Sequence, residues 1–184
     1  MKNNEYRVDL VSKYITQLNL SEDIKNYFLG RNILVTGGAG AIGSNLVIAL
    51  SELVGQTGIV IVLDNLSAIK GDDPIDYPSL VNVMFVNGDI RNDVDLKRVF
   101  RERPTIIFHL AAFFANQNSV DYPENSAEVD INGMIKLLDF AQFTNVERFV
   151  YASSGCAIYG SYGEMPLKED FISMHLTTPY QINK

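Results

Sequence analysis

Residues 36–43 have the sequence TGGAGAIG, and this stretch decides the fold. It follows the apolar run Ile33-Leu34-Val35 and precedes apolar residues at helical spacing over 42–53. A short apolar run that stops at glycines is typical of a strand buried on both faces. The glycines satisfy both GxGxxG and GxxGxxG, which lets the backbone turn sharply, approach a phosphate and pack a helix closely. The stretch therefore predicts a strand, a phosphate-binding loop and a helix whose N-terminus faces an anion.

On the C-terminal side, strand and helix patterns alternate. The expected strands are 59–63, 83–86, 106–110 and 149–152, and the expected helices after 42–53 are 93–101 and 124–144. The long helix is predicted to carry an apolar set on one face: Ile131, Met134, Ile135, Leu138 and Ala141. Alternation of this kind predicts an α/β fold, a Rossmann-like doubly wound parallel sheet with helices on both faces.

Asp64 ends the second expected strand. An acidic side chain at that position accepts hydrogen bonds from the hydroxyls of an adenosine ribose and repels a 2′-phosphate. Because it follows a glycine loop set between a strand and a helix, it favours NAD over NADP as the cofactor.

Residues 1–30 are predicted to be a helical N-terminal extension to a cofactor-binding domain at 31–184. Apolar residues recur at helical spacing from Leu10 to Leu18, Ser21 is suited to cap a second helix, and Gly30 is suited to end it. We expect the extension to pack on the domain or on another subunit. The longest irregular stretch, 65–79, is expected to be an exposed loop.

Composition excludes several classes of protein. The net charge of −7 disfavours nucleic acid as a partner, and no apolar run approaches the ~20 residues of a membrane span. No basic segment followed by an apolar stretch begins the chain, and the single cysteine, Cys156, allows neither an internal disulfide nor a cysteine metal cluster. We expect a reduced, soluble, cytoplasmic protein with no metal site and no membrane partner.

Seven segments in order resemble the extended short-chain dehydrogenases, the nucleotide-sugar epimerases and dehydratases, with UDP-glucose 4-epimerase the nearest type. They are TGGAGAIGSN (36–45), DNLS (64–67), GDI (88–90), HLAA (109–112), INGMIKLLDFA (131–141), YASSGCAIYG (151–160) and PYQINK (179–184). The resemblance covers 31–184, and it is more specific for the family than for the substrate. It implies NAD as cofactor, a nucleotide-sugar substrate, a UDP-sugar first, and a homodimer packed through the long helices.

Positions that match the family's motifs are implied to bind the cofactor. They are Gly37, Gly40, Ala41, Ile42, Gly43, Asp64, Asn65, Leu66, Ser67, Asp89, Ile90, Leu110, Ala111, Ala112, Phe114, Tyr180 and Lys184. Among them Asp89 and Ile90 lie where the family holds the adenine, and Phe114 stands where epimerases often have a lysine. Asn132 matches the family's structural asparagine. His109 is expected to be a buried, hydrogen-bonded histidine and not a catalytic one.

Tyr180 and Lys184 form a Y-x-x-x-K pair, and positions i and i+4 share one face of a helix. A tyrosine with a pKa near ~10 is a poor base at neutral pH. A neighbouring ammonium and a cationic nicotinamide favour the phenolate, which can then take a proton from a sugar hydroxyl. We expect Tyr180 to be the catalytic base and Lys184 to support it and to hold the nicotinamide ribose.

The family's catalytic Ser or Thr has no direct match here, because both spacing rules of the family place it at Gly155. Ser154 is predicted to supply the hydroxyl through a small backbone shift, so Ser154→Ala should cost far more turnover than Ser153→Ala. The alternatives are a site that uses Tyr180 alone and a site that has lost activity.

Cys156 and Ala157 stand at two positions that distinguish members of the family. The family's dehydratases have two acidic residues there, and its decarboxylases have a Ser-Glu pair. Because epimerization at C4 needs no extra acid, an NAD-dependent epimerase ranks first. A dehydratase or reductase, a non-catalytic NAD-binding module, and an assembly subunit that uses 1–30 as its contact are the alternatives. Family members usually continue beyond the position of Lys184 into a substrate domain, so we expect these 184 residues to bind NAD weakly and to turn nothing over.

Overall fold

The computed structural model describes residues 2–68, 80–160 and 165–184. Five parallel strands form one sheet in the order β3-β2-β1-β4-β5. Their bounds are Asn32–Thr36 for β1, Ile59–Asp64 for β2, Val83–Asn87 for β3, Ile106–His109 for β4 and Arg148–Tyr151 for β5. The predicted doubly wound sheet is confirmed, and each predicted strand agrees with the observed one to within one or two residues.

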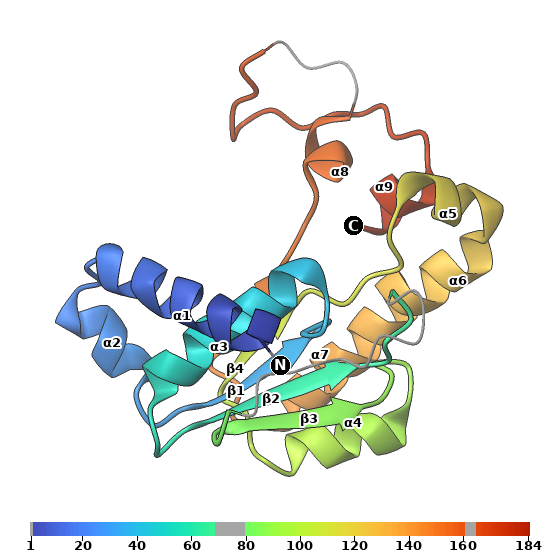
Figure 1. Cartoon of the computed structure of the whole chain (residues 1–184). Coiled ribbons are helices and arrows are strands. Elements are labelled where there is room, and N and C mark those ends of the chain that lie inside the picture. Colours follow the sequence, from blue (N-terminus) through green and yellow to red (C-terminus); the bar gives the residue numbers. More distant parts are fainter. Residues whose placement is uncertain (1, 69–79, 161–164) are drawn as a thin grey trace.

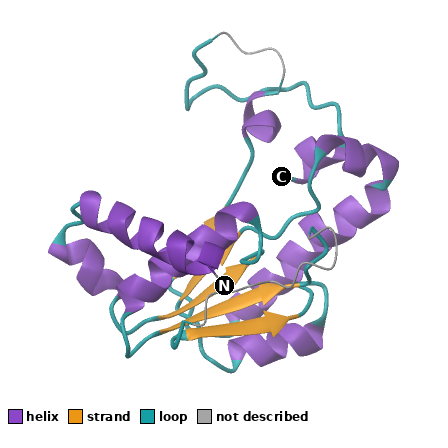
Figure 2. Ribbon diagram, in the orientation of Figure 1, coloured by secondary structure: helices purple, strands orange, loops and turns teal. Residues whose placement is uncertain are grey.

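Helices cover both faces of the sheet (Figures 1 and 2). On one face, α3 (Ala41–Val54) packs Val47, Leu50 and Val54 against β1 and β2. On the other face, α4 (Asp93–Phe100) and α7 (Met134–Gln142) pack Leu96, Val99 and Leu137 against the strands. The alternating inward residues of each strand, such as Ile33 and Leu34, are divided between these two cores, which is why the strands are apolar along their whole length.

The N-terminal extension consists of α1 (Lys2–Gln17) and α2 (Glu22–Phe28), and both contact α3. Ser21 caps α2 by accepting a hydrogen bond from the Ile24 N–H, and Gly30 follows the helix with a φ of +73°, as predicted. Val11 is half-buried, whereas Leu10 and Tyr14 are exposed, so only part of the predicted apolar face packs. The division of the chain at residue 30 stays a prediction.

The predicted long helix is a continuous helical run made of α6 (Pro123–Ala127), the π-helical segment η1 (Glu128–Gly133) and α7. Of the five residues expected on its apolar face, Ile131, Ile135 and Leu138 are exposed, whereas the other two are half-buried. The run is buried along a neighbouring stripe that contains Ser126, Asp130, Gly133 and Leu137. Hydropathy selects the wrong stripe because the buried one carries a hydroxyl, a carboxylate and a glycine.

Three short helices, α5 (Asn116–Asp121), α8 (Gly155–Tyr159) and α9 (Pro179–Asn183), gather with α6 at one end of the sheet (Figure 1). Most of the loop expected at 65–79, residues 69–79, lies outside the described residues. Among the helices that the structure describes, none has both the length and the hydropathy needed to cross a bilayer.

Candidate active site

A cavity of about 460 Å³ opens where the five strands end, and residues from 37 to 184 line it. The strand order reverses between β1 and β4, and ligands of open α/β sheets bind at such a switch point. Every predicted cofactor-binding residue lines this cavity except Leu66. The structure therefore brings the predicted set together, and the role of each residue in cofactor binding stays a prediction.

The glycine loop needs its glycines for steric reasons. Gly37 has a φ of +69°, and a Cβ on it would lie 2.6 Å from the Ala111 nitrogen, so β1 and β4 can approach only without a side chain. A Cβ on Gly43 would overlap the Gly37 carbonyl oxygen and lie 2.7 Å from the Gly38 Cα. Gly40 begins α3 without a side-chain cap, so the first N–H groups of this helix stay available to an anion in the cavity.

Asp64 is oriented by backbone donors at the end of β2. Its carboxylate accepts the Ala39 N–H at 2.8 Å and the Leu66 N–H at 2.8 Å, so one oxygen bonds the glycine loop and the other bonds the turn that follows. A carboxylate has about four acceptor sites, which leaves capacity for a ribose hydroxyl. The side chain lines the cavity, as its predicted role requires.

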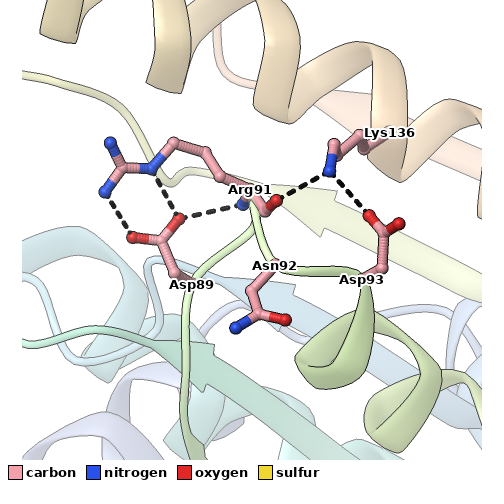
Figure 3. Close-up of a pocket in the computed structure, with 5 residues that line it drawn as sticks. All are labelled: Asp89, Arg91, Asn92, Asp93 and Lys136. Carbon is pink, nitrogen blue, oxygen red and sulfur yellow. Dashed lines mark hydrogen bonds and ion pairs between the residues drawn. The ribbon is translucent and has the colours of Figure 1, made fainter.

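Asp89 lies at the same end of the cavity, where the family resemblance places the adenine. Arg91 holds its carboxylate in a bidentate pair, with Nε 2.9 Å from Oδ1 and Nη2 2.7 Å from Oδ2, as Figure 3 shows. Asn65 donates a third side-chain hydrogen bond to it at 2.9 Å. Chiefly because of the Arg91 hydrogen bonds, the pKa of Asp89 falls to about 2, so this carboxylate stays ionised at neutral pH.

A second ion pair stabilises the shallow pocket beside Asp89 (Figure 3). Lys136, from α7, donates to the Arg91 carbonyl oxygen at 2.9 Å and to Asp93 at 2.7 Å, which ties the long helical run to the start of α4. The cations drawn there are paired with carboxylates or carbonyls of the chain itself. This polar cluster therefore holds the adenine end of the cavity in shape.

Tyr180 is placed by a helix that is short but strongly capped. Thr178 and Gln181 form a capping box at the start of α9. The Tyr180 N–H donates to the buried Ser119 Oγ at 3.0 Å, and the ring of Phe114 lies edge-on to that of Tyr180, with centroids 6.1 Å apart. These contacts hold the Tyr180 side chain at the wall of the cavity, although α9 is too short to be stable alone.

Ser154 makes the hydrogen bond with the Tyr180 side chain. The adjacent Ser153 lines the cavity but donates to the Lys184 carbonyl oxygen at 3.4 Å. Ser154 also lies 3.1 Å from the Cys156 Sγ. Gly155 itself carries no hydroxyl, and the choice of Ser154 over Ser153 as its source stays a prediction.

The expected electrostatic support of Tyr180 by Lys184 is not seen. Burial raises the pKa of Tyr180 and outweighs the lowering by the Ser154 hydrogen bond, so the phenol is the favoured form in the chain by itself. The ammonium of Lys184 lies over the ring of Tyr151, 4.5 Å from its centroid. Burial lowers the pKa of Lys184, and the charge of Asp130 opposes that shift. Sequence spacing placed both side chains at the cavity but could not give their protonation.

His109 is buried, as predicted. Its Nδ1 lies 2.6 Å from the Thr36 hydroxyl oxygen, and its ring stacks on Tyr151 with centroids 5.6 Å apart. Burial lowers its pKa to about 4, with a smaller contribution from Lys184. A neutral, satisfied histidine at this position packs β1 against β4 and is not available to a substrate.

Sequence reasoning missed several residues at the site. The cavity is also lined by Ala39, Phe113, Val129, Ala152 and Ser153. In addition, Ser119 accepts a hydrogen bond from the Tyr180 N–H. Asn132, expected to be structural, is exposed and donates to Glu128 at 2.8 Å, whereas the buried polar residue of that helical run is Asp130. The cavity-lining residues could have been predicted, because they are close in sequence to residues already expected at the strand ends. Ser119 could not, because it lies on a polar helix without apolar periodicity.

Comparison with known proteins agrees with this geometry. The profile of the NAD dependent epimerase/dehydratase family matches residues 33–184. A putative UDP-glucose 4-epimerase of Methanocaldococcus jannaschii is 36% identical over 153 residues, covering 83% of this chain and 47% of that protein. The chain thus spans about half the length of such relatives.

Solved structures show the same arrangement. An epimerase from Methanothermobacter thermautotrophicus superposes with a TM-score of 0.80 at 49% identity, covering 88% of this chain and 46% of the other. The UDP-glucose 4-epimerase of Thermus thermophilus, solved in complex with NAD, superposes with a TM-score of 0.69 at 37% identity, covering 83% of this chain and 47% of the other. The family match over most of the chain, together with the glycine loop and the Tyr180 site, shows that this chain belongs to the NAD-dependent epimerase/dehydratase family.

Proposed function

We propose that this chain supplies the cofactor site and the proton-transfer residues of an NAD-dependent nucleotide-sugar epimerase, of the UDP-sugar 4-epimerase type. The observation that carries the proposal is the meeting of the glycine loop with Tyr180 and Lys184 at one cavity, with Ser154 beside the Tyr180 side chain. One relative described above is a putative UDP-glucose 4-epimerase and another is a UDP-glucose 4-epimerase solved with NAD, which supports the choice of reaction and of nucleotide.

The cavity suits an extended dinucleotide. Gly37 and Gly43 keep the loop backbone bare where a pyrophosphate would approach the start of α3. Asp64 and Asp89 stand on the side of β2 and β3, where the adenosine would lie, and Tyr180 stands across the switch point. The carboxylate of Asp64 favours NAD over NADP because it would repel a 2′-phosphate.

Bound NAD would accept a hydride from the sugar and return it. The residues of this chain would manage the proton: Tyr180 takes it from the sugar hydroxyl, and Ser154 holds the Tyr180 oxygen in place. Because burial raises the pKa of Tyr180, a positive charge beside the phenol is required before it can act as a base at neutral pH. We assign that charge to the nicotinamide of bound NAD, because the ammonium of Lys184, although at the same wall, lies over the ring of Tyr151.

The neighbours of Ser154 favour an epimerase over a dehydratase. Neither Cys156, which contacts Ser154, nor Phe114, which contacts Tyr180, carries a carboxylate, and Ala157 is buried in α8. Elimination needs a further acid and base at the reacting carbons, whereas epimerization needs hydride removal, rotation of the keto-sugar and hydride return. A reductase and a non-catalytic NAD-binding module stay as alternatives.

A homodimer packed through the long helical run is part of the proposal. The exposed stripe of Ile131, Ile135 and Leu138 on that run supplies an apolar surface for it.

The proposal is tested by thermal denaturation of the chain with NAD and with NADP. A ligand that binds the native state stabilises it by about 2.7 kcal/mol at a concentration of 100 times its dissociation constant. Stabilisation by NAD and not by NADP is expected, and absence of a response to NAD would contradict the proposal. Adding a UDP-sugar then separates the alternatives, because an epimerase interconverts UDP-sugars without net formation of NADH.

A further inference from the structure

Asp130 is a buried carboxylate that the proposed reaction does not use. It lies in η1 with 4% of its surface exposed. Among the residues that the structure describes, it is the only Asp or Glu that is buried. A charge is costly to bury without partners, so a carboxylate retained in this position calls for a reason.

The hydrogen bonds around Asp130 fit the ionised form. The Phe113 N–H, which can only donate, lies 2.8 Å from Oδ1. The Asn183 amide nitrogen, also a donor, bonds the Ser126 Oγ at 3.0 Å. That leaves the Ser126 proton for Oδ2 of Asp130, 3.1 Å away. Both carboxylate oxygens therefore accept, and neither has to carry a proton.

These bonds join Asp130 to both sides of the candidate active site. Phe113 belongs to the segment that leaves β4 and lines the cavity. Asn183 belongs to α9, one residue before Lys184. The carboxylate thus ties the end of β4, the long helical run and the helix that carries Tyr180 into one unit.

We propose that Asp130 is a positioning residue: its hydrogen bonds hold α9 over the cavity, and its buried charge acts on Lys184. The proposal rests on the proposed catalytic role of Tyr180 and Lys184. The charge of Asp130 opposes the effect of burial on Lys184, since it raises the pKa of that ammonium and so favours the protonated form. The same charge raises the pKa of Tyr180, which makes a positive charge at the nicotinamide position a condition for the phenolate.

Other titratable groups lie beside this unit, and they decide which controls a titration of Tyr180 needs. Tyr151, on β5, lies under the Lys184 ammonium, and Asp130 raises the pKa of its phenol. His109, on β4, is kept neutral by burial and adds no charge near neutral pH. Cys156, on α8, raises the pKa of Tyr180 as Asp130 does. A tyrosine titration must therefore separate Tyr180 from Tyr151.

The test is an ultraviolet tyrosinate titration of the parent chain and of Asp130→Asn, each with and without Tyr180→Phe. Subtraction isolates Tyr180 from the other tyrosines. Asparagine can keep the bonds to Phe113 and Ser126 while removing the charge, so the pKa of Tyr180 should fall. The matched control is Asp139→Asn, which removes an equal charge from an exposed position on α7. A Tyr180 pKa that is unchanged in Asp130→Asn, or that moves equally in Asp139→Asn, would overturn the proposal.

A second measurement does not depend on the folding of an Asp130 variant. The carboxyl of Asp130 is titrated by carbon-13 nuclear magnetic resonance in the parent and in Lys184→Gln. Burial raises the pKa of Asp130 and Lys184 lowers it, so removal of the ammonium should raise it further. An identical Asp130 titration in both proteins would overturn the proposal. Neither measurement needs NAD or turnover, so a failure of the proposed function can be told apart from a failure of the proposal about Asp130.

Discussion

Replacing Gly43 by alanine should damage the fold and the cofactor site together. Alanine favours a helix over glycine by about 1 kcal/mol, and Gly43 lies in the first turn of α3. The added Cβ would overlap the Gly37 carbonyl oxygen and stand 2.7 Å from the Gly38 Cα. Overpacking costs about 1–3 kcal/mol, and we take the upper part of that range, about 2–3 kcal/mol, because both atoms belong to backbone that cannot move aside. The net loss should be about 1–2 kcal/mol.

The matched control is Gly40→Ala. Gly40 has a φ of −70°, which alanine adopts without strain, and its Cβ would meet only the Gly37 oxygen, at 3.3 Å. We measure thermal unfolding with and without NAD. Gly43→Ala should lower Tm by roughly 2–8 °C, taking about 2–4 °C per kcal/mol for a domain of this size, and should abolish the NAD response. Gly40→Ala should keep Tm and lose part of that response, because it places a methyl group at the cavity wall. Equal Tm and equal NAD response in Gly43→Ala and the parent would refute the steric argument.

Three further outcomes are expected. Asp64→Asn should weaken the thermal response to NAD and allow one to NADP, because the charge that repels a 2′-phosphate is gone; an unchanged preference would speak against the role of Asp64. Ser154→Ala should raise the pKa of Tyr180 in a tyrosinate titration, since its hydrogen bond lowers that pKa, whereas Ser153→Ala should not; equal values in both variants would remove Ser154 from the site. Asp89 has a native pKa of about 2 against an ordinary 3.8, so its ion pair should stabilise the fold fully above pH 4 and lose that contribution as the pH falls from about 4 to 2. Urea denaturation across this range should therefore show a steeper acid loss in the parent than in Asp89→Asn, and parallel curves would contradict the coupling.

Local physics explains what could be predicted from sequence. The strands are short runs of apolar residues bounded by turns, and parallel strands bring their carboxyl ends to one edge. That edge is where Gly37, Asp64, Asp89 and Leu110 were expected and where they lie. Tyr180 could be assigned to the same cavity only through the family resemblance, because residues 165–178 form no regular element.

What could not be predicted depends on tertiary contacts. The buried stripe of the long helical run contains Asp130 and Gly133, which hydropathy treats as solvent-facing. Glycine is required at position 133, since a Cβ there would lie 2.7 Å from the Ile90 side chain. The protonation of Tyr180 and Lys184 likewise depends on burial, which spacing along a helix does not report. Sequence patterns therefore placed the predicted site residues at one cavity and gave no account of their charge.

The switch point between β1 and β4 has a consequence for protein engineering. The wall on one side of the cavity comes from residues 37–90, and the wall on the other comes from residues 110–184. A single crossover in the segment that joins them would exchange one wall between homologous sequences while leaving the other intact. Chimeric libraries built at that boundary could therefore screen nucleotide preference and proton-transfer chemistry as two separable traits.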